Sequence, residues 1–320
     1  MRKHQRHRDI WLLLQRGLGA SLQQLWHYLG MISKKTNPFI GLSRINKREY
    51  AGAGVFDLLN IVEEQAPSFQ EGETRDMFLF LHFINILMKA KVDFLVQGGI
   101  LLATVLNDHC RRTHDIDVIV KDPDRFYADV KSAVSNSDSE IEFEVAYVKK
   151  KEASEQYYKN TFAFRVTAYR NREAISIFII DGVYIDYYDE IEREKYLGPE
   201  IIDKGFYFYG VDMEYVASVK ILAVSSELPR PVKHLVDLYG LTKVKLDIGK
   251  VKKHLKSCLW RENIIRRRLG KPELNEDYSI KSDKQFLGNY VYEAISGGYK
   301  LGFKEMKEQV NAWIESMICA

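Results

Sequence analysis

Apolar residues in the middle of this chain switch between a helical and a strand spacing. Residues 75–90 and the segment after Pro123 carry apolar positions three and four residues apart, which predicts two helices. Short runs rich in β-branched and aromatic residues predict strands over residues 92–97, 115–120, 141–148 and 162–169. Helices and strands that alternate in this way favour an α+β fold, in which helices flank a mixed β-sheet.

The regions on either side of this block show a mainly helical pattern. Residues 1–74 predict a helical leader that begins with a run of basic residues, and residues 211–320 predict a helical C-terminal domain. A length of 320 residues, with 46% hydrophobic and 28% charged residues, is typical of a globular protein with two or three modules. We therefore expect the sheet-containing core to occupy residues 75–210.

The predicted strand over residues 115–120 carries two carboxylates on one face. Side chains alternate between the two faces of a strand, so Asp115 and Asp117 project to one side while Ile116 and Val118 pack behind them. Oxygen ligands suit a hard cation, Mg²⁺ with Mn²⁺ as the alternative, that also binds substrate phosphates. The pair therefore predicts a site for two metal ions and a nucleotide.

Two glycines upstream of this strand predict the place of the phosphates. Gly98 and Gly99 end one predicted strand and open a helix. Because they lack side chains, phosphate oxygens can approach the free backbone N–H groups at the positive end of the helix dipole. A polyphosphate bound at this turn would lie beside the metal ions.

The order of these features resembles the nucleotidyltransferase superfamily typified by DNA polymerase β. Its mark is a Gly-Gly or Gly-Ser turn followed, after a short helix, by Asp-x-Asp. The local form, in which the two glycines are followed by Arg111-x-Thr113 and then by the aspartates, is most similar to the AbiEii/AbiGii abortive-infection toxin branch. The resemblance implies that Asp115 and Asp117 bind metal and act in catalysis. The residues to which it assigns nucleotide binding here are Gly98, Gly99, Arg111 and Thr113.

The superfamily implies a third carboxylate on a later strand, and residues 174–189 contain three candidates. Two strand-like runs in this segment are separated by Asp181 and Gly182, a pair that predicts a tight hairpin turn. Asp181 is then a turn residue, whereas Asp186 lies inside the second strand, where an acid is costly unless it has a function. Asp186 is therefore the predicted third catalytic and metal-binding residue, with Asp189 in reserve.

A second cluster of candidates follows in the helical region. Asp212 is placed to cap a helix that carries Lys220, and a second helix carries Lys233 and Asp237 four residues apart on one face. The toxin branch has a lysine helix before a charged helix, so the resemblance implies nucleotide binding by Lys220, Lys233 and Asp237. His234 stands where that pattern often has an acid. From spacing alone, Lys233 and Asp237 also fit a surface ion pair.

The net charge of +3 is unevenly distributed. The segment that begins at Lys243 and ends at Lys271 holds 11 lysines or arginines against two acids, Asp247 and Glu262. Such a basic face predicts binding of RNA phosphates, although a solvated helix has the same pattern. The basic run over residues 2–8 is a second place for nucleic-acid contact.

Cysteine usage and hydropathy bear on the compartment. Three cysteines are too few for a disulfide framework, which fits a reducing cytoplasm. The apolar stretch over residues 10–32 is interrupted by polar and charged residues, so no membrane or secretory segment is expected.

Together, these features predict a Mg²⁺-dependent enzyme that moves an NMP or a short nucleotide tract from an NTP to a hydroxyl acceptor. By resemblance, the acceptor is a tRNA 3′ end or a protein, and a cognate antitoxin is implied. The closest alternative is an antibiotic nucleotidyltransferase of the aminoglycoside or lincosamide type, which residues 113–117 also match. A catalytically silent nucleotide-binding or partner-binding module is the alternative from another class.

Overall fold

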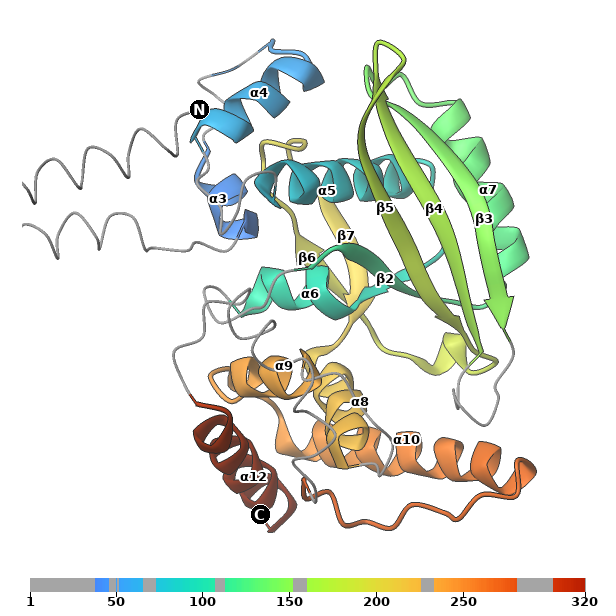
Figure 1. The fold of residues 1–320 in the computed structure, drawn as a ribbon, viewed down its shortest axis with the longest axis vertical. Helices are drawn as coiled ribbons and strands as arrows, with labels where there is room; N and C mark the ends of the chain where they lie inside the picture. Colours follow the sequence, from blue (N-terminus) through green and yellow to red (C-terminus); the bar gives the residue numbers. More distant parts are fainter. Residues whose placement is uncertain are drawn as a thin grey trace, which may run out of the picture. The chain divides into compact units, whose positions relative to one another are not determined.

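The computed structural model describes residues 38–45, 50, 52–65, 73–106, 113–151, 160–225, 233–280 and 302–319 (Figure 1). These residues all belong to one compact unit, residues 36–320. The predictions for Arg111, for the basic run over residues 2–8 and for the stretch over residues 10–32 lie outside the described residues. The division into a leader, a core and a C-terminal domain stays a prediction.

Helices and strands alternate through the first two thirds of the described chain. The helices are α3 (Pro38–Arg44), α4 (Val55–Gln65), α5 (Glu73–Lys89), α6 (Gly98–Val105) and α7 (Pro123–Ser135). The strands are β1 (Leu95–Gln97), β2 (Asp115–Val120), β3 (Glu142–Lys151), β4 (Thr161–Arg170), β5 (Glu173–Tyr184), β6 (Arg193–Leu197) and β7 (Tyr207–Val211). Helices follow, α8 (Met213–Ser225), α9 (Lys233–Leu241), α10 (Ile248–Arg268) and α12 (Phe303–Cys319).

The seven strands form one mixed sheet in the order β3-β4-β5-β2-β1-β7-β6, which confirms the predicted α+β fold. β2 lies at its centre, antiparallel to β1 and parallel to β5. β1 in turn pairs in parallel with β7, which comes more than a hundred residues later in the chain. The strand with the two aspartates is therefore held on both sides.

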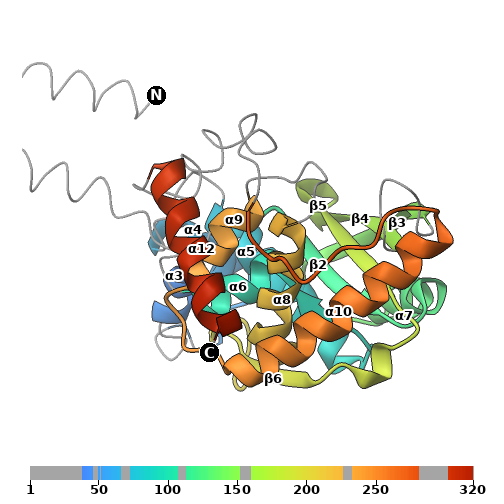
Figure 2. The same cartoon turned by 90° about the horizontal axis from the view of Figure 1, so that it is seen from below.

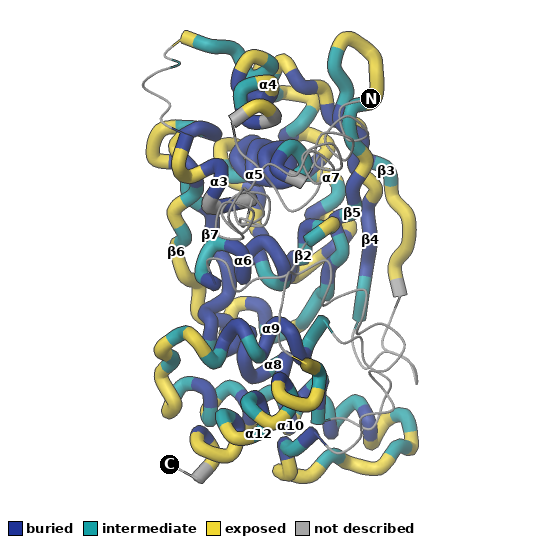
Figure 3. The backbone as a smooth tube through the Cα atoms, turned by 60° about the vertical axis from the view of Figure 1, so that its left-hand side comes forward, coloured by how far each residue is buried: buried dark blue, intermediate teal, exposed yellow. Residues whose placement is uncertain are grey.

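One face of the sheet is covered by α5 and α7 through aromatic packing. Phe83 of α5 contacts Phe143 and Phe178 at ring distances of 5.1 and 5.7 Å. On α7, Phe126 stacks on Phe164 at 5.9 Å. Figure 3 shows this buried layer along α5 and β4. Because aromatic rings bury large apolar areas, this packing fixes which face of the sheet remains available for polar residues.

The predicted hairpin around Asp181 is wrong. β5 runs without a break from Glu173 to Tyr184, and its turn with β4 lies instead at Asn171 and Arg172, which have φ angles of +50° and +69°. Positive φ at both central residues is typical of a two-residue hairpin turn. Gly182 serves close packing inside the sheet, because a Cβ atom there would collide with the Phe162 ring.

The C-terminal helices begin directly at the end of the sheet. Asp212 follows β7 and caps α8 as predicted, since its Oδ1 accepts a hydrogen bond from the Tyr215 N–H (2.6 Å). α8 then packs against both α9 and α10. None of the helices in the described part of the chain combines the length and the apolar character needed to cross a bilayer.

Candidate active site

Asp115 and Asp117 lie on the same face of β2 and are half-buried. The side chains that alternate with them point to the opposite face and are buried. The backbone N–H of Gly99 donates a hydrogen bond to Asp117 Oδ2 (3.3 Å). Thr113 Oγ1 donates to the Asp115 carbonyl oxygen at 3.3 Å and lies 3.5 Å from Asp115 Oδ1. The structure therefore brings together four of the predicted site residues, and these contacts orient both carboxylates.

The glycine turn contacts these aspartates directly. Gly98 has a φ angle of +67°, in the left-handed region that favours glycine, and a Cβ atom there would collide with the Asp117 carboxylate. A Cβ atom on Gly99 would collide with Thr113 Oγ1. The turn thus places Asp117 at the amino end of α6, where the helix dipole and free N–H groups stabilise negative charge.

The neighbouring strand supplies a third carboxylate, and it is Asp181. In the parallel register of β2 and β5, Asp181 lies directly opposite Asp117, so it projects to the same face. Burial and the charge of Asp115 raise the pKa of Asp181. Asp186, which the sequence predicted inside a strand, lies in an exposed turn after β5, and the exposed Asp189 forms an ion pair with Lys121.

Two lysines act on Asp181 in the opposite direction. The positive charges of Lys149 on β3 and Lys233 on α9 lower the pKa of Asp181 against the effect of its burial. Lys233 was predicted, whereas sequence reasoning missed Lys149. The sequence offered one signal for Lys149, the run of three lysines, Lys149 to Lys151, that ends β3. In the sheet, β3 lies two strands away from β5, which is the neighbour of β2. Cations from two separate elements therefore influence the carboxylate face.

Lys220 and Asp237 form a buried ion pair between α8 and α9. Lys220 Nζ lies 2.7 Å from Asp237 Oδ2, and the two side chains are 10% and 1% exposed. His234 Nδ1 lies 3.3 Å from the same Lys220 nitrogen. A surface pair between Lys233 and Asp237 is therefore excluded, because the Asp237 carboxylate points inward to α8.

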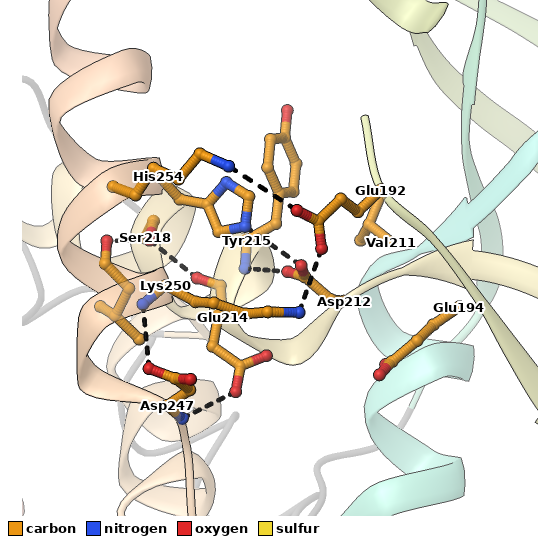
Figure 4. Close-up of polar contacts among 12 residues, drawn as sticks. Glu192, Glu194, Val211, Asp212, Glu214, Tyr215, Ser218, Asp247, Lys250 and His254 are labelled. Carbon is orange, nitrogen blue, oxygen red and sulfur yellow. Dashed lines mark hydrogen bonds and ion pairs between the residues drawn. The ribbon is translucent and has the colours of Figure 1, made fainter. Parts of the chain in front are cut away.

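The basic segment from Lys243 to Lys271 is only partly a basic face. Arg266 is buried and pairs with Glu262 on its own helix (3.2 Å), so it is not part of an exposed surface. Lys250 Nζ contacts Glu192 (3.0 Å), as Figure 4 shows. Arg261 pairs with Glu190 (2.6 Å). Acids from outside the segment therefore neutralise part of the charge that the sequence suggested.

Further polar contacts join α10 to the end of the sheet. Asp212 Oδ2 lies 3.1 Å from His254 Nε2, and the Asp247 N–H donates to Glu214 Oε1 (2.8 Å), as Figure 4 shows. Burial alone would raise the pKa of Asp212, but the hydrogen bonds from His254 and the Tyr215 N–H lower it overall. These contacts fix α10 next to α8.

The donor chemistry on the carboxylate face fits Mg²⁺. Asp115, Asp117 and Asp181 offer carboxylate oxygens on one face of two adjacent strands. In the part of the chain that the structure describes, no three acidic, histidine or cysteine side chains are arranged to hold a metal by themselves. Mg²⁺ commonly takes one or two carboxylates and completes its octahedron with water and substrate phosphates, which this arrangement permits.

Residues 87–313 match the family model described as nucleotidyl transferase AbiEii toxin, type IV TA system. Among solved structures, the chain is similar to a candidate nucleotidyltransferase of H. pylori, at 15% identity and a TM-score of 0.47, over 78% of this chain and 95% of that one. The structure of JHP933 from Helicobacter pylori aligns at 16% identity and a TM-score of 0.46, over 78% and 92% of the two chains. No protein of curated function matches this chain.

Proposed function

Because this chain belongs to the AbiEii nucleotidyl transferase toxin family, we propose that it transfers an NMP, or a short tract of them, from an NTP to a hydroxyl acceptor. The observation that carries the proposal is the register that places Asp181 opposite Asp117, beside Asp115, on one sheet face. In the proposed step, the acceptor oxygen attacks the α-phosphorus. The bond from that phosphorus to its bridging oxygen breaks, and pyrophosphate leaves.

Asp115, Asp117 and Asp181 form the proposed catalytic set, in which Asp115 and Asp117 are the metal ligands. Asp181 replaces Asp186, because only Asp181 shares the face of the other two carboxylates. Its raised pKa makes it a better proton acceptor than an ordinary aspartate, so we assign it the proton of the attacking hydroxyl. Bound Mg²⁺ or Mn²⁺ would supply charge neutralisation at the phosphates and acidify the acceptor hydroxyl.

The glycine turn and the nearby cations are assigned to the phosphates. Gly98 and Gly99 leave room for Asp117 and Thr113 at the amino end of α6, and Thr113 orients Asp115. Phosphates that share a metal ion with these carboxylates would therefore lie beside the positive end of the helix. Lys233 and Lys149 add positive charge beside Asp181, which would offset charge that develops on the leaving group. We assign Lys220 and Asp237 to positioning, since their ion pair holds the helix that carries Lys233. Arg111 remains a predicted phosphate ligand.

RNA is the proposed acceptor, and a cognate antitoxin is the proposed protein partner. The family description, a toxin of a type IV toxin–antitoxin system, supports both a nucleotide substrate and an antitoxin. It also favours this activity over modification of an antibiotic. The acceptor test is direct: purified protein is incubated with each labelled NTP and total cellular RNA, and label in RNA is compared with label in protein.

The carboxylate set is tested by replacing each member with asparagine. Asp115→Asn, Asp117→Asn and Asp181→Asn should each reduce transfer on the order of a hundredfold or more, because each removes a negative charge that holds metal or accepts a proton. The readout is transfer of labelled NMP at saturating Mg²⁺, with thermal unfolding to show that each variant folds.

Asp186→Asn is the matched control, since it removes an acid of the same size five residues from Asp181 in an exposed turn. It should keep full activity. An active Asp181→Asn variant together with an inactive Asp186→Asn variant would refute the assignment. Full activity of Asp115→Asn or Asp117→Asn would refute the metal site as a whole.

A further inference from the structure

We propose that one exposed side of α10 binds single-stranded RNA, with Trp260 as the surface on which an unpaired base stacks. We call this side the Trp260 stripe; its members are Lys253, Lys256, Trp260 and Arg267. The inference rests on the proposed function, because it names the form of RNA that the acceptor presents and the surface that receives it.

Helix geometry places these four residues on one side of α10. Lys253 and Trp260 are seven residues apart, as are Trp260 and Arg267, and Lys256 precedes Trp260 by four. These separations are close to whole turns of an α-helix. All four side chains are exposed, and Trp260 is 62% exposed, among the highest values for a large apolar side chain in the described chain.

The opposite side of α10 is covered. Its buried residues are Val251, Leu255, Leu259, Asn263 and Arg266. Asn263 exchanges two hydrogen bonds with the Leu274 backbone (2.9 and 2.8 Å), and Arg266 Nη1 donates to the Pro272 carbonyl oxygen (3.2 Å). The segment after α10 therefore folds back along this covered side. In Figure 2, α10 crosses the front of the view from below, on the surface of the molecule.

The charges on and near the stripe favour a polyanion. Lys256 and Arg268 form no ion pair with any described residue. Lys253 has only a 3.7 Å contact with Glu192, which Lys250 already approaches at 3.0 Å. Arg267 pairs with Glu273 at 2.9 Å, but both side chains are about half exposed, so water screens the pair. Positive charge therefore remains on both sides of the Trp260 ring.

A flat apolar ring between cations matches the chemistry of an unpaired nucleotide strand. Proteins that bind single strands combine a positive surface along the backbone with aromatic rings that stack on the bases. An acidic protein would pair with the same lysines, but it does not carry a planar ring beside each anionic group, as a nucleotide strand does. Duplex RNA hides its base faces in the stack and would contact only the charges.

The helix that carries the stripe, α10, lies next to the turn that follows β5. Arg261, the neighbour of Trp260, places its guanidinium 3.5 Å from the centre of the Tyr187 ring and donates to Glu190 Oε2 (2.6 Å). Tyr187 comes three residues after the end of β5, the strand that carries Asp181. RNA bound to the stripe would therefore lie on the helix that contacts the end of the Asp181 strand.

Binding to two polyanions separates stacking from charge. Trp260→Ala should weaken binding of a short unstructured RNA roughly tenfold, because base–aromatic stacking is lost, and should leave binding of heparin unchanged. Lys256→Ala should weaken binding of both polyanions and lower the slope of log affinity against log salt by about 0.7. Trp260→Phe should recover most of the RNA affinity. Leu197→Ala, which removes another exposed apolar side chain (72% exposed) far along the chain on β6, is the control and should bind like the parent.

Binding is measured without NTP by fluorescence anisotropy, so it does not depend on catalysis. Equal RNA affinity of Trp260→Ala and the parent would overturn the proposal, as would equal losses for RNA and heparin. Failure of the parent to bind RNA would also overturn it and would point to an acidic protein acceptor. If Asp115→Asn retains full transfer while Trp260→Ala loses RNA binding, the proposed function fails and the RNA surface stands.

Discussion

Among single residues, Asp181 combines partial burial with a position beside Asp115, and both features oppose its ionisation. Together they raise its pKa in spite of Lys149 and Lys233. A carboxyl group whose pKa is raised on folding stabilises the fold below its ordinary pKa of 3.8, and this contribution is lost as the pH rises through the folded value. Above the folded value, ionised Asp181 therefore lowers stability. This is typical of a group that is retained for its chemistry.

Gly98 allows a sharp test at the same scale, because Gly205 is a matched control. Both glycines have positive φ angles, +67° and +73°, but only at Gly98 would a Cβ atom collide with Asp117, whereas Gly205 faces open space. Each change to alanine should cost about 1 kcal/mol of unfolding free energy for the backbone conformation. Only Gly98→Ala should also reduce transfer, roughly a hundredfold, because it displaces a carboxylate from its working position.

Urea unfolding and the rate of NMP transfer are measured for both glycine variants. If Gly205→Ala loses as much activity as Gly98→Ala, the loss comes from general backbone strain. The contact between the glycine turn and Asp117 would then have no special role.

Among the elements, α8 is buried along most of its length and yet carries Lys220. An unpaired ammonium group inside a protein is costly, so the position of α9 is tied to that of α8 by the need to place Asp237 against Lys220. Lys233 begins α9, four residues before Asp237. The buried pair therefore holds the helix that begins with Lys233 against α8.

Breaking this pair should destabilise the protein strongly. Lys220→Met should lower the unfolding free energy by about 3–5 kcal/mol, because it leaves the Asp237 carboxylate buried without its cation. The double variant Lys220→Met, Asp237→Leu should recover part of that loss, since no buried charge remains. Lys304→Met is the control. Lys304 also pairs with an acid, in this case one on its own helix, but its side chain is 90% exposed. It should change stability by less than about 1 kcal/mol.

Denaturant unfolding of all four proteins gives the comparison. A double variant that is less stable than Lys220→Met would show that the pair holds α8 and α9 together through its shape rather than through its charge.

The point where the sheet meets the helices depends on a charged carboxylate. Asp212 links the end of β7 to α8 and, through His254, to α10, with Lys250 and Glu192 nearby (Figure 4). The pKa of Asp212 is lowered on folding. Its contribution to stability is therefore complete above its ordinary pKa of 3.8 and is lost as the pH falls through the lower folded value.

Asp212→Asn should therefore destabilise the protein at neutral pH and have little effect in strong acid. Asparagine can still cap α8, so the change isolates the charge, which we expect to contribute about 1–3 kcal/mol through its hydrogen bonds. Unfolding in urea is followed from neutral pH to below 3.8. The difference between parent and variant should shrink as the pH falls, whereas Asp186→Asn should match the parent throughout. A difference that stays constant with pH would contradict the charge-based explanation.

Features that depend on nearby residues can be predicted from the sequence. The face shared by Asp115 and Asp117, the glycine-led start of α6, the helices α5 and α7 and the cap of α8 all follow from local spacing, because strand alternation, helix period and capping act within a few residues. The α+β fold followed from the alternation of such segments.

Which distant residues join them depends on long-range contacts that the sequence pattern does not record. Asp181 and Gly182 carry a strong local turn signal, but pairing of β5 with β2 and close packing of Phe162 on Gly182 hold them in a strand. Pairing between strands that are far apart in the chain overrides a two-residue preference, because it satisfies a whole ladder of hydrogen bonds and buries an apolar face. Pairing between strands that are far apart in the chain also explains why the sequence did not predict β6 and β7. The predicted basic face included Arg266, which is buried. Its acceptor, the Pro272 carbonyl oxygen, belongs to a segment that folds back along α10, and no local sequence pattern indicates this return.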